Sequence, residues 1–362
     1  MLNTLRKLDW ILIVSIVLLA TIGLLSLWSS SFGKGDFTNF NKQLFFFSFG
    51  LLLMFFVISF DWRFLRESSF LILILYFIFL LGLLSLLLFA PEIRGVKRWF
   101  KIGIFSIDPT EFIKIIIIIL LAKYFSVRHI ELYQIKHILL SGIYVFLPLI
   151  LIFPQPDLGS VLILISLWIG ILLLSGIKMR HFLVLCLVFL LAFALSWQFA
   201  LRDYQKERII TFVAPQLSDP LGAGWSQIQS KVAIGSGSLF GKGFKMGSQT
   251  QYGFLPEPQT DFIFAAIAEE FGFAGVSILL TLFLIVFWRI IKIAILSQSN
   301  FPRIFSSGLA ILLIIQIFIH IGMNLGILPI IGIPLPLVSY GGGSLILTFF
   351  AMGVLQSIKV HP

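Results

Sequence analysis

Long apolar runs separated by short polar segments dominate the chain, and they predict membrane-spanning helices. The runs do not alternate between apolar and polar residues, as the strands of a membrane barrel would. A helix needs ~20 residues to cross the hydrocarbon core of a bilayer. We therefore predict about ten transmembrane helices, of which the fourth, fifth, sixth and tenth are short. Their ranges are 10–28, 43–60, 69–90, 111–125, 138–153, 160–176, 181–199, 262–291, 304–325 and 344–358.

Composition supports this interpretation and excludes a soluble protein. The 362 residues are 59% hydrophobic and only 12% charged, and the mean hydropathy is +1.06, whereas soluble chains are about 25% charged. The net charge of +10 would suggest nucleic acid in a soluble protein, but here most cations lie in short loops, so no nucleic-acid partner is expected. The predicted fold class is an all-α polytopic membrane protein, with residues 1–362 forming a single integral membrane domain.

The distribution of Lys and Arg predicts the orientation, because short cytoplasmic loops collect these residues. Both termini are predicted to be cytoplasmic. A long loop at about 200–261, between the seventh and eighth helices, is then extracytoplasmic, and long loops are exempt from the charge rule. The shorter outer loop 91–110 is not exempt, so its cations call for a functional explanation. They are Arg94, Lys97, Arg98 and Lys101.

A carboxylate stands at the mouth of the eighth predicted helix, after a proline-rich approach. Thr260 would cap this helix, and Asp261 in its first turn would suit the helix dipole. Alternatively, Asp261 is held at the water–lipid boundary to meet a substrate that is half lipid and half polar. Glu257 nearby, and Glu269 and Glu270 deeper in the helix, favour the second interpretation, because an ionisable group at bilayer depth costs ~3 kcal/mol. We expect these two glutamates to line a water-filled or protein-lined interior.

Two further acidic positions precede or begin helices on the same predicted outer side. Glu111 and Lys114 have the i, i+3 spacing of an ion pair, which either neutralises itself or belongs to a site. Asp157 is either an N-cap or a site residue. With Asp261 and the cations of loop 91–110, these acids predict an outer cavity for an anionic, sugar-bearing lipid.

The long loop contains a glycine-rich run at 233–243. It matches neither the dinucleotide fingerprint nor the P-loop pattern. One interpretation is a flexible or surface loop, since glycines serve any tight backbone path. The other is a backbone that closes over a phosphate or sugar, with Lys231, Lys242 and Lys245 as cations.

The ninth predicted helix carries one polar stripe, Gln316, His320 and Asn324, for which hydrogen bonding between helices is the favoured role. Three prolines and four glycines follow within residues 328–344. Such a sequence cannot continue a helix, so we predict a re-entrant segment at about 326–343 that is buried in protein.

Cofactor chemistry has little support in the sequence. The five histidines are scattered and Cys186 is the single cysteine, so a zinc site is not expected. Cys186 lies in an apolar run and is predicted to be a buried residue without a chemical role. No metal ligands are assigned, although a divalent cation, Mg or Mn, is a candidate cofactor.

Motifs along nearly the whole chain, in order, resemble the SEDS family (shape, elongation, division, sporulation), and resemble its RodA, or elongation, branch more than its FtsW, or division, branch. The motifs are Lys97-Arg98-Trp99, Pro109-Thr110-Glu111 with Lys114, Pro156-Asp157-Leu158-Gly159, Asp219-Pro220-Leu221-Gly222-Ala223-Gly224-Trp225, Gln229-Ser230-Lys231-Val232-Ala233-Ile234-Gly235-Ser236-Gly237, Gly247-Ser248-Gln249-Thr250-Gln251, Phe254-Leu255-Pro256-Glu257, Thr260-Asp261-Phe262-Ile263-Phe264-Ala265 and Pro334-Leu335-Pro336-Leu337-Val338-Ser339-Tyr340-Gly341-Gly342.

The resemblance implies a peptidoglycan glycosyltransferase of the bacterial cytoplasmic membrane, with its active site facing outward. Such proteins polymerise lipid II into glycan strands beside a class B penicillin-binding protein and the elongation machinery. The family's essential aspartate corresponds to Asp261, our candidate general base in an inverting reaction. The supporting or substrate-binding candidates are Glu111, Lys114, Asp157, Arg98, Trp99, Lys231, Glu257 and Ser339. The departures from the family pattern are Gln259 for His, Asp108 for Gln, Thr110 for Ser, Gly343 for Ser and His320 for Asn.

Two other functions remain as alternatives. A lipid II flippase or transporter would also have many helices with intramembrane acids, although acids on a transport path should follow the membrane normal rather than gather at one face. A non-enzymatic scaffold for a penicillin-binding protein would tolerate changes of acid to amide.

Overall fold

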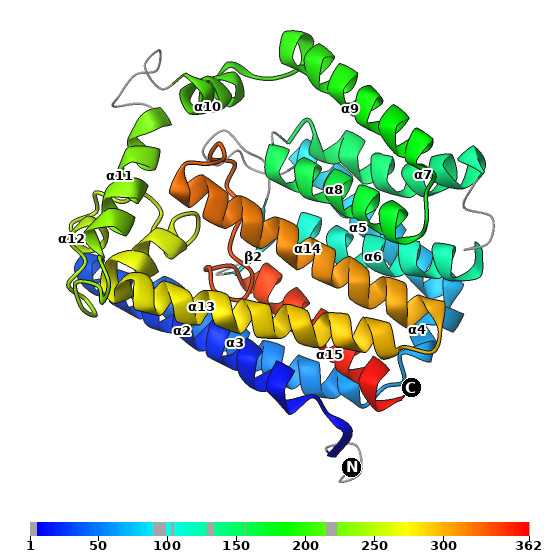
Figure 1. Ribbon diagram of the computed structural model, residues 1–362, viewed down its shortest axis with the longest axis horizontal. Coiled ribbons are helices and arrows are strands. Elements are labelled where there is room, and N and C mark those ends of the chain that lie inside the picture. Colours follow the sequence, from blue (N-terminus) through cyan, green and yellow to red (C-terminus); the bar gives the residue numbers. More distant parts are fainter. Residues whose placement is uncertain are drawn as a thin grey trace.

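The computed structural model describes residues 6–89, 99–102, 105–128, 134–155, 157–214 and 223–361. Most of them are helical, and long helices lie side by side in one bundle (Figure 1). Each predicted range falls on one of these helices, with ends shifted by a few residues. They are α2 (Trp10–Lys34), α3 (Thr38–Ile58), α5 (Ser69–Phe89), α6 (Pro109–Arg128), α7 (Ile135–Ile152), α8 (Leu158–Leu174), α9 (Met179–Phe199), α13 (Ile263–Leu296), α14 (Asn300–Leu325) and α15 (Gly342–Val360).

Within the described ranges, 8 helices are long and apolar enough to cross a membrane. The class of polytopic helical membrane protein is thereby confirmed. Helix α8 is apolar but has only 17 residues, and the 20 residues of α6 include Glu111, Lys114, Lys123 and Arg128. The number of ten crossings therefore stays a prediction.

Several short elements were not predicted. Helix α4 (Arg63–Glu67) follows α3, and an antiparallel hairpin of β1 (Phe100–Ile102) and β2 (Phe105–Ile107) precedes α6. The long loop carries three helices, which are α10 (Asp203–Val213), α11 (Ala223–Ser236) and α12 (Ser248–Gln251).

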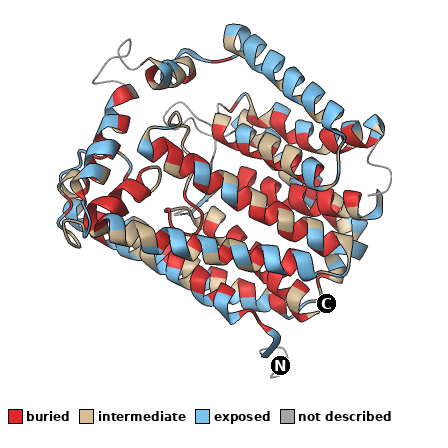
Figure 2. Ribbon diagram, in the orientation of Figure 1, coloured by how far each residue is buried: buried red, intermediate tan, exposed pale blue. Residues whose placement is uncertain are grey.

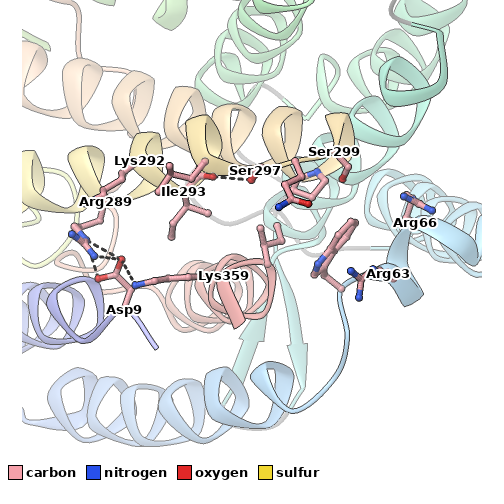
Figure 3. A pocket seen from close by; sticks show the side chains of 14 residues that line it. Asp9, Arg63, Arg66, Arg289, Lys292, Ile293, Ser297, Ser299 and Lys359 are labelled. Carbon is pink, nitrogen blue, oxygen red and sulfur yellow. Dashed lines mark hydrogen bonds and ion pairs between the residues drawn. The ribbon is translucent and has the colours of Figure 1, made fainter. Parts of the chain in front are cut away.

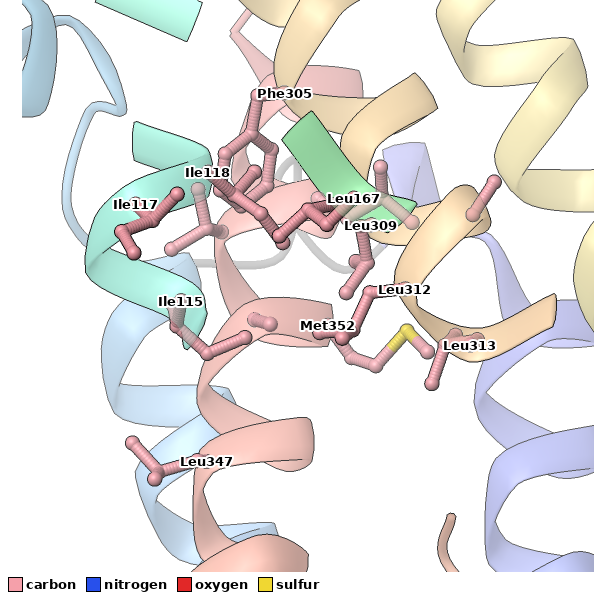
Figure 4. Close-up of a cluster of buried hydrophobic side chains, with 14 of the residues drawn as sticks. Ile115, Ile117, Ile118, Leu167, Phe305, Leu309, Leu312, Leu313, Leu347 and Met352 are labelled. Atoms are coloured by element: carbon pink, nitrogen blue, oxygen red, sulfur yellow. The ribbon is translucent and has the colours of Figure 1, made fainter. Parts of the chain in front are cut away.

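The centre of the bundle is apolar, and α14 packs there against α6, α8 and α13 (Figures 1 and 2). Figure 4 shows side chains of α6, α8, α14 and α15 in one buried cluster, among them Ile118, Leu167, Leu309 and Met352. Helices α3 and α15 approach closely at Gly353, where an added Cβ would lie 2.9 Å from the carbonyl oxygen of Met54. Small residues at such crossings allow the backbone contact that holds helices together in lipid.

Helix α9 is an exception, because none of its residues is buried (Figure 2). It lies at the edge of the bundle in Figure 1, where Phe189 contacts Phe146 of α7 and Trp168 of α8. Cys186 is accordingly exposed, and the prediction that it is buried was wrong. An apolar run predicts contact with lipid as well as it predicts contact with protein, so the sequence could not separate the two.

Asp9 ties three helices together at the end of the bundle that holds both termini. Its carboxylate caps α2 through Leu12 N (3.2 Å). It also accepts from Arg289 of α13 (2.6 Å) and Lys359 of α15 (3.1 Å), and Figure 3 draws these two contacts. Burial raises the pKa of Asp9, but the hydrogen bonds from Arg289, Leu12 and Lys359 outweigh burial and hold that pKa below its ordinary value of 3.8.

Replacing Asp9 by Asn should lower the free energy of unfolding by about 3 kcal/mol, because it leaves two cations at a largely buried site without their carboxylate. Since the pKa of Asp9 is lowered in the folded state, the wild-type stabilisation is complete above pH 3.8 and is lost as the pH falls through the folded value. Thermal unfolding in detergent measures both effects. Asp61→Asn, at an exposed ion pair, should change stability by less than about 1 kcal/mol.

Candidate active site

The turn that precedes α13 is fixed by bonds to its main chain. Three consecutive carbonyl oxygens, those of residues 259, 260 and 261, accept hydrogen bonds from outside the turn. Their donors come from α14 and from the irregular segment 326–341 between α14 and α15. The bonds are Tyr340 N to Gln259 O (2.8 Å), Ser339 Oγ to Thr260 O (2.7 Å) and Asn324 Nδ2 to Asp261 O (2.9 Å).

Asn324 links the turn to the helix that follows. Besides donating to Asp261, its Oδ1 accepts from Ala265 N at 3.2 Å, and its side chain is fully buried. His320, one helical turn earlier, shares a hydrogen bond between Nδ1 and the carbonyl of Ile333 (2.8 Å). These two members of the polar stripe on α14 therefore make the predicted hydrogen bonds between elements.

Helix α13 begins too late in the chain for Thr260 to be its N-cap. Helix α13 starts at Ile263, its N-cap is Phe262 without a side-chain bond, and no acid lies in its first turn. Thr260 is therefore not the cap, and Asp261 lies ahead of the helix. Of the two interpretations, the one in which these residues simply begin the helix is therefore wrong.

The carboxylate of Asp261 is half-buried and lies beside Gly332 of the irregular segment. A Cβ built on Gly332 would be 3.6 Å from Asp261 Oδ2, and Gly332 has φ of +69°. Glu257 is exposed, and its carbonyl accepts from Thr260 N (3.2 Å) and Phe262 N (3.3 Å). Glu257 thus shapes the turn through its backbone, in a left-handed conformation with φ of 43°.

The side chain of Gln259 connects the turn to helices α2 and α3. Its Nε2 donates to the hydroxyls of Ser30 (3.1 Å) and Ser31 (3.2 Å), and its Oε1 accepts from Asn39 at 2.7 Å. Ser339, which donates to the turn, is itself held by α3, because the side-chain amide of Gln43 donates to the carbonyl of Ser339 at 3.1 Å. The turn that carries Asp261 is therefore held by four parts of the bundle, which are α2, α3, α14 and the irregular segment 326–341.

Asp157 adjoins the same irregular segment from α8. Its carboxylate accepts from Ser160 N (3.0 Å) and Ser160 Oγ (2.6 Å), so it is an N-cap as one interpretation held. A Cβ on Gly159 would lie 2.9 Å from Ile333 and 3.1 Å from the carbonyl of Ile331. The start of α8 and the carboxylate of Asp261 therefore both contact residues 331–333.

Glu111 and Lys114 form a buried ion pair at 2.7 Å, so the pair neutralises its own charge. A Cβ on Gly82 of α5 would lie 3.7 Å from Pro109, which begins α6. The amide of Gln155, just before Asp157, donates to the carbonyl of the next α5 residue, Leu83, at 3.0 Å. The three acids at positions 111, 157 and 261 therefore lie at one end of the bundle.

Two cations lie close to the irregular segment. Lys231 of α11 packs over Gly326, where an added Cβ would be 2.6 Å from its Nζ, at the negative end of the α14 dipole. Arg208 of α10 donates to the carbonyl of Ile330 at 3.3 Å. The sequence did not single out Arg208, because no local pattern relates residues 122 positions apart.

The structure gives little information on the two predicted site residues of the loop before α6. Arg98 lies outside the described residues, and Trp99 is half-buried directly before β1. In the described part of the chain, no three His, Cys, Asp or Glu side chains come together to hold a metal ion. Mg²⁺ in phosphate chemistry is commonly held by one or two carboxylates and the substrate's own phosphates, so this finding leaves the candidate divalent cation untested.

Helix α13 is interrupted at Gly272, and the glycine-rich loop binds the backbone groups that the interruption leaves free. At Gly272 the backbone is not helical (φ 63°, ψ −162°). Residues 238–243 supply the hydrogen bonds that the break removes, in the manner of a short strand laid across the helix. The bonds are Lys242 N to Glu269 O (2.9 Å), Gly243 N to Glu270 O (3.0 Å), Phe273 N to Ser238 O (2.9 Å) and Ala274 N to Leu239 O (3.0 Å).

The carboxylates of Glu269 and Glu270 are buried in protein. This is one of the two environments that the sequence predicted for them, the other being a water-filled interior. Glu269 accepts from Lys242 Nζ (3.1 Å) and from the backbone N–H groups of Gln249 (2.8 Å) and Thr250 (3.1 Å). Glu270 accepts from the hydroxyl of Ser29 in α2 and from Nε2 of Gln251 in the loop (3.4 Å). Both glutamates therefore fasten the loop 237–251 to the bundle, and Lys242 serves that purpose rather than binding a phosphate.

Gly241→Ala should detach this loop, because Gly241 has φ of +80° and an added Cβ would lie 2.1 Å from the carbonyl of Glu270. We expect a loss of about 1–3 kcal/mol and faster proteolysis of residues 237–251. Gly235→Ala is the matched control, because nothing lies within 4 Å of its Cβ position and Ala favours the helix. Equal proteolysis of the two variants would contradict the assigned role of Gly241.

These features define a polytopic helical membrane protein with one carboxylate fixed at the end of the bundle where the chain turns into α13. A family model described as cell cycle protein, covering FtsW, RodA and SpoVE, matches residues 9–362. The chain belongs to this family.

Named relatives and solved structures agree with that assignment. The chain is 39% identical to the peptidoglycan glycosyltransferase MrdB of Escherichia coli K12, over 79% of this chain and 77% of the relative. It is 31% identical to the peptidoglycan glycosyltransferase RodA of Treponema pallidum, over 98% of both chains. Its structure resembles a chain of a peptidoglycan synthase complex (TM-score 0.82, 30% identity, 97% of each chain) and the Thermus thermophilus rod shape determining protein RodA (TM-score 0.72, 28% identity, 97% and 96%).

Proposed function

We propose that this chain is a peptidoglycan glycosyltransferase that polymerises lipid II into glycan strands during cell-wall elongation, with Asp261 as the general base. The observation that carries the proposal is the Asp261 turn. Its three carbonyls are held from two other elements while the carboxylate stays half-buried. A base must be positioned within hydrogen-bond reach of the proton that it removes, and a turn held in this way provides such positioning.

The reaction is a single displacement at the anomeric carbon of the donor sugar. A hydroxyl is a poor nucleophile at neutral pH, so the 4-hydroxyl of the acceptor GlcNAc gives its proton to the Asp261 carboxylate as its oxygen attacks. The bond from the anomeric carbon to the pyrophosphate breaks, and the pyrophosphate leaves with the bonding electron pair. An α-linked pyrophosphate becomes a β-1,4 linkage, so the configuration is inverted and no covalent intermediate forms.

Negative charge that develops on the pyrophosphate requires nearby cations. Lys231 and Arg208 are our assignments, because both contact the irregular segment that adjoins Asp261. Lys114 is a weaker choice than the sequence suggested, since Glu111 already neutralises it and only 1% of Lys114 is exposed. Arg98 and Trp99 keep the supporting roles that the family resemblance implies.

The proposed surroundings follow from the same assignment. The Asp261 end of the bundle faces outward from the bacterial cytoplasmic membrane, and both termini are cytoplasmic. The partner is a class B penicillin-binding protein within the elongation machinery. Similarity to a chain of a peptidoglycan synthase complex supports such a partner.

Glycan formation from labelled lipid II tests the proposal. The purified chain with its penicillin-binding partner should produce polymer of many disaccharide units, and neither protein alone should match the pair. Lipid II that crosses liposome membranes without polymer would instead identify a flippase. Polymer formed by the partner alone, at the rate of the pair, would leave this chain as a scaffold.

A further inference from the structure

A cavity lies at the opposite end of the bundle from Asp261. Its volume is about 580 Å³, within the size range of ligand sites. Figure 3 shows that it lies between the start of α2, the helix α4, the ends of α13 and α15 and the link from α13 to α14. No step of the proposed reaction uses it.

The charge of this cavity is strongly positive. Five cationic side chains and the single carboxylate of Asp9 line it, which leaves a formal excess of four positive charges. Asp9 is already engaged by two of the cations. The five cations are Arg63, Arg66, Arg289, Lys292 and Lys359.

Arg66 and Lys292 are the cations available to a ligand. Among the described residues no carboxylate lies within ion-pair distance of either, and their recorded contacts are with the rings of Trp62 and Trp288. Lys123 of α6, whose Nζ is buried without a partner, lies close enough to Arg66 for electrostatic repulsion. Cations without counter-charges that line one cavity are suited to an anion.

Polar groups suited to a phosphate complete the wall. Ser299 lines the cavity at the N-terminus of the 26-residue helix α14, and its buried hydroxyl has no hydrogen-bond partner. The free N–H groups of a helix N-terminus favour phosphate oxygens. A helix N-terminus and unpaired cations therefore line the same cavity.

The apolar part of the wall favours a lipid as the source of the phosphate. Leu296 lines the cavity and is 68% exposed, and its neighbour Ile295 is 71% exposed. Trp288, which is 58% exposed, lies about two turns before them on α13, as an aromatic residue at a membrane interface would. The rim of the cavity thus continues into the surface of a membrane-spanning helix, where an acyl chain can follow.

We propose that this cavity binds the phosphate headgroup of an anionic phospholipid in the membrane leaflet next to the chain termini. Basic pockets between membrane helices are suited to such headgroups. Figure 3 shows Arg66 and Lys292 at opposite ends of the cavity, so the phosphate lies beside Arg66 and the N-terminus of α14, and Lys292 attracts the anionic headgroup at longer range. The glycerol and acyl chains leave past Leu296. The lipid thereby joins α4, α13 and α14 at a position remote from the polymerase site.

Native mass spectrometry of the full chain, titrated with phosphatidylglycerol, tests the proposal. Each cation near an anionic surface contributes about fivefold to affinity. Arg66→Gln combined with Lys292→Gln should therefore weaken binding about 30-fold, whereas Arg66→Lys with Lys292→Arg should restore it. The matched control is Lys136→Gln with Arg180→Gln, two exposed cations outside the cavity, which should bind like wild type.

Four results would overturn the proposal. They are equal binding by the Gln double variant, equal retention of phosphatidylcholine by wild type, saturation of the cavity by inorganic phosphate at concentrations that displace the lipid, and displacement of the lipid by a polyglutamate peptide. The third would identify a site for free phosphate. The fourth would identify a site for an acidic protein segment.

Discussion

Replacing Asp261 by Asn should lower the rate of glycan polymerisation by about 10²–10⁴-fold, the usual contribution of general acid–base catalysis. The amide keeps the shape of the side chain but cannot take a proton from the acceptor hydroxyl. The bond from Asn324 goes to the backbone carbonyl of Asp261, so the turn should persist. Single-turnover assays with labelled lipid II measure the effect.

The control for this variant is Asp203→Asn, an exposed acid of α10 outside the contacts that hold the turn. It should polymerise within about twofold of wild type, as surface substitutions usually do. Thermal unfolding should be unchanged for both variants. Polymerisation by Asp261→Asn at the wild-type rate would remove Asp261 as the base.

The second large effect is expected from a residue without a direct role in the chemistry. Asn324→Ala leaves the carbonyl of Asp261 and the N–H of Ala265 without their hydrogen bonds to this side chain. This should lower the free energy of unfolding by about 1–3 kcal/mol. A misplacement of about 1 Å at a reacting group can cost about 10²-fold. We therefore expect kcat to fall by about that factor, with KM for lipid II nearly unchanged.

Unfolding would also lower the apparent kcat and leave KM unchanged, because it reduces the amount of active enzyme. Positioning is therefore distinguished by expressing kcat per folded enzyme, with the folded fraction taken from thermal unfolding. Gln316→Ala is the matched control, because Gln316 is a buried polar residue on the same face of α14 and takes no part in the bonds to the turn. If both variants lose the same activity in proportion to their loss of stability, Asn324 has no positioning role.

The sequence predicted the helices well, because apolar runs of membrane length report directly on their environment. It also predicted an irregular segment at about 326–343, since the prolines and glycines there cannot continue a helix, and the structure differs only in that α15 begins at Gly342. Local patterns could not reveal how Asp261 is held. Its partner Asn324 is 63 residues away, and the choice of Asp261 as a site rested on its position and on the family motifs.

The break in α13 was missed for a similar reason. A single glycine inside a helical pattern is tolerated, so Gly272 gave no signal. Its meaning depends on residues 238–243, whose own glycines were interpreted as a flexible loop or a phosphate loop. The structure shows instead that Gly241 permits a backbone contact with Glu270.

This break also determines how much of α13 must lie in the membrane. Residues 272–296 rise about 37 Å at 1.5 Å per residue, which exceeds the ~30 Å thickness of the hydrocarbon layer. That part of α13 can cross the bilayer alone. Residues 263–271, with both glutamates, can then project into the headgroup region, where the apparent cost of two carboxylates inside lipid does not arise.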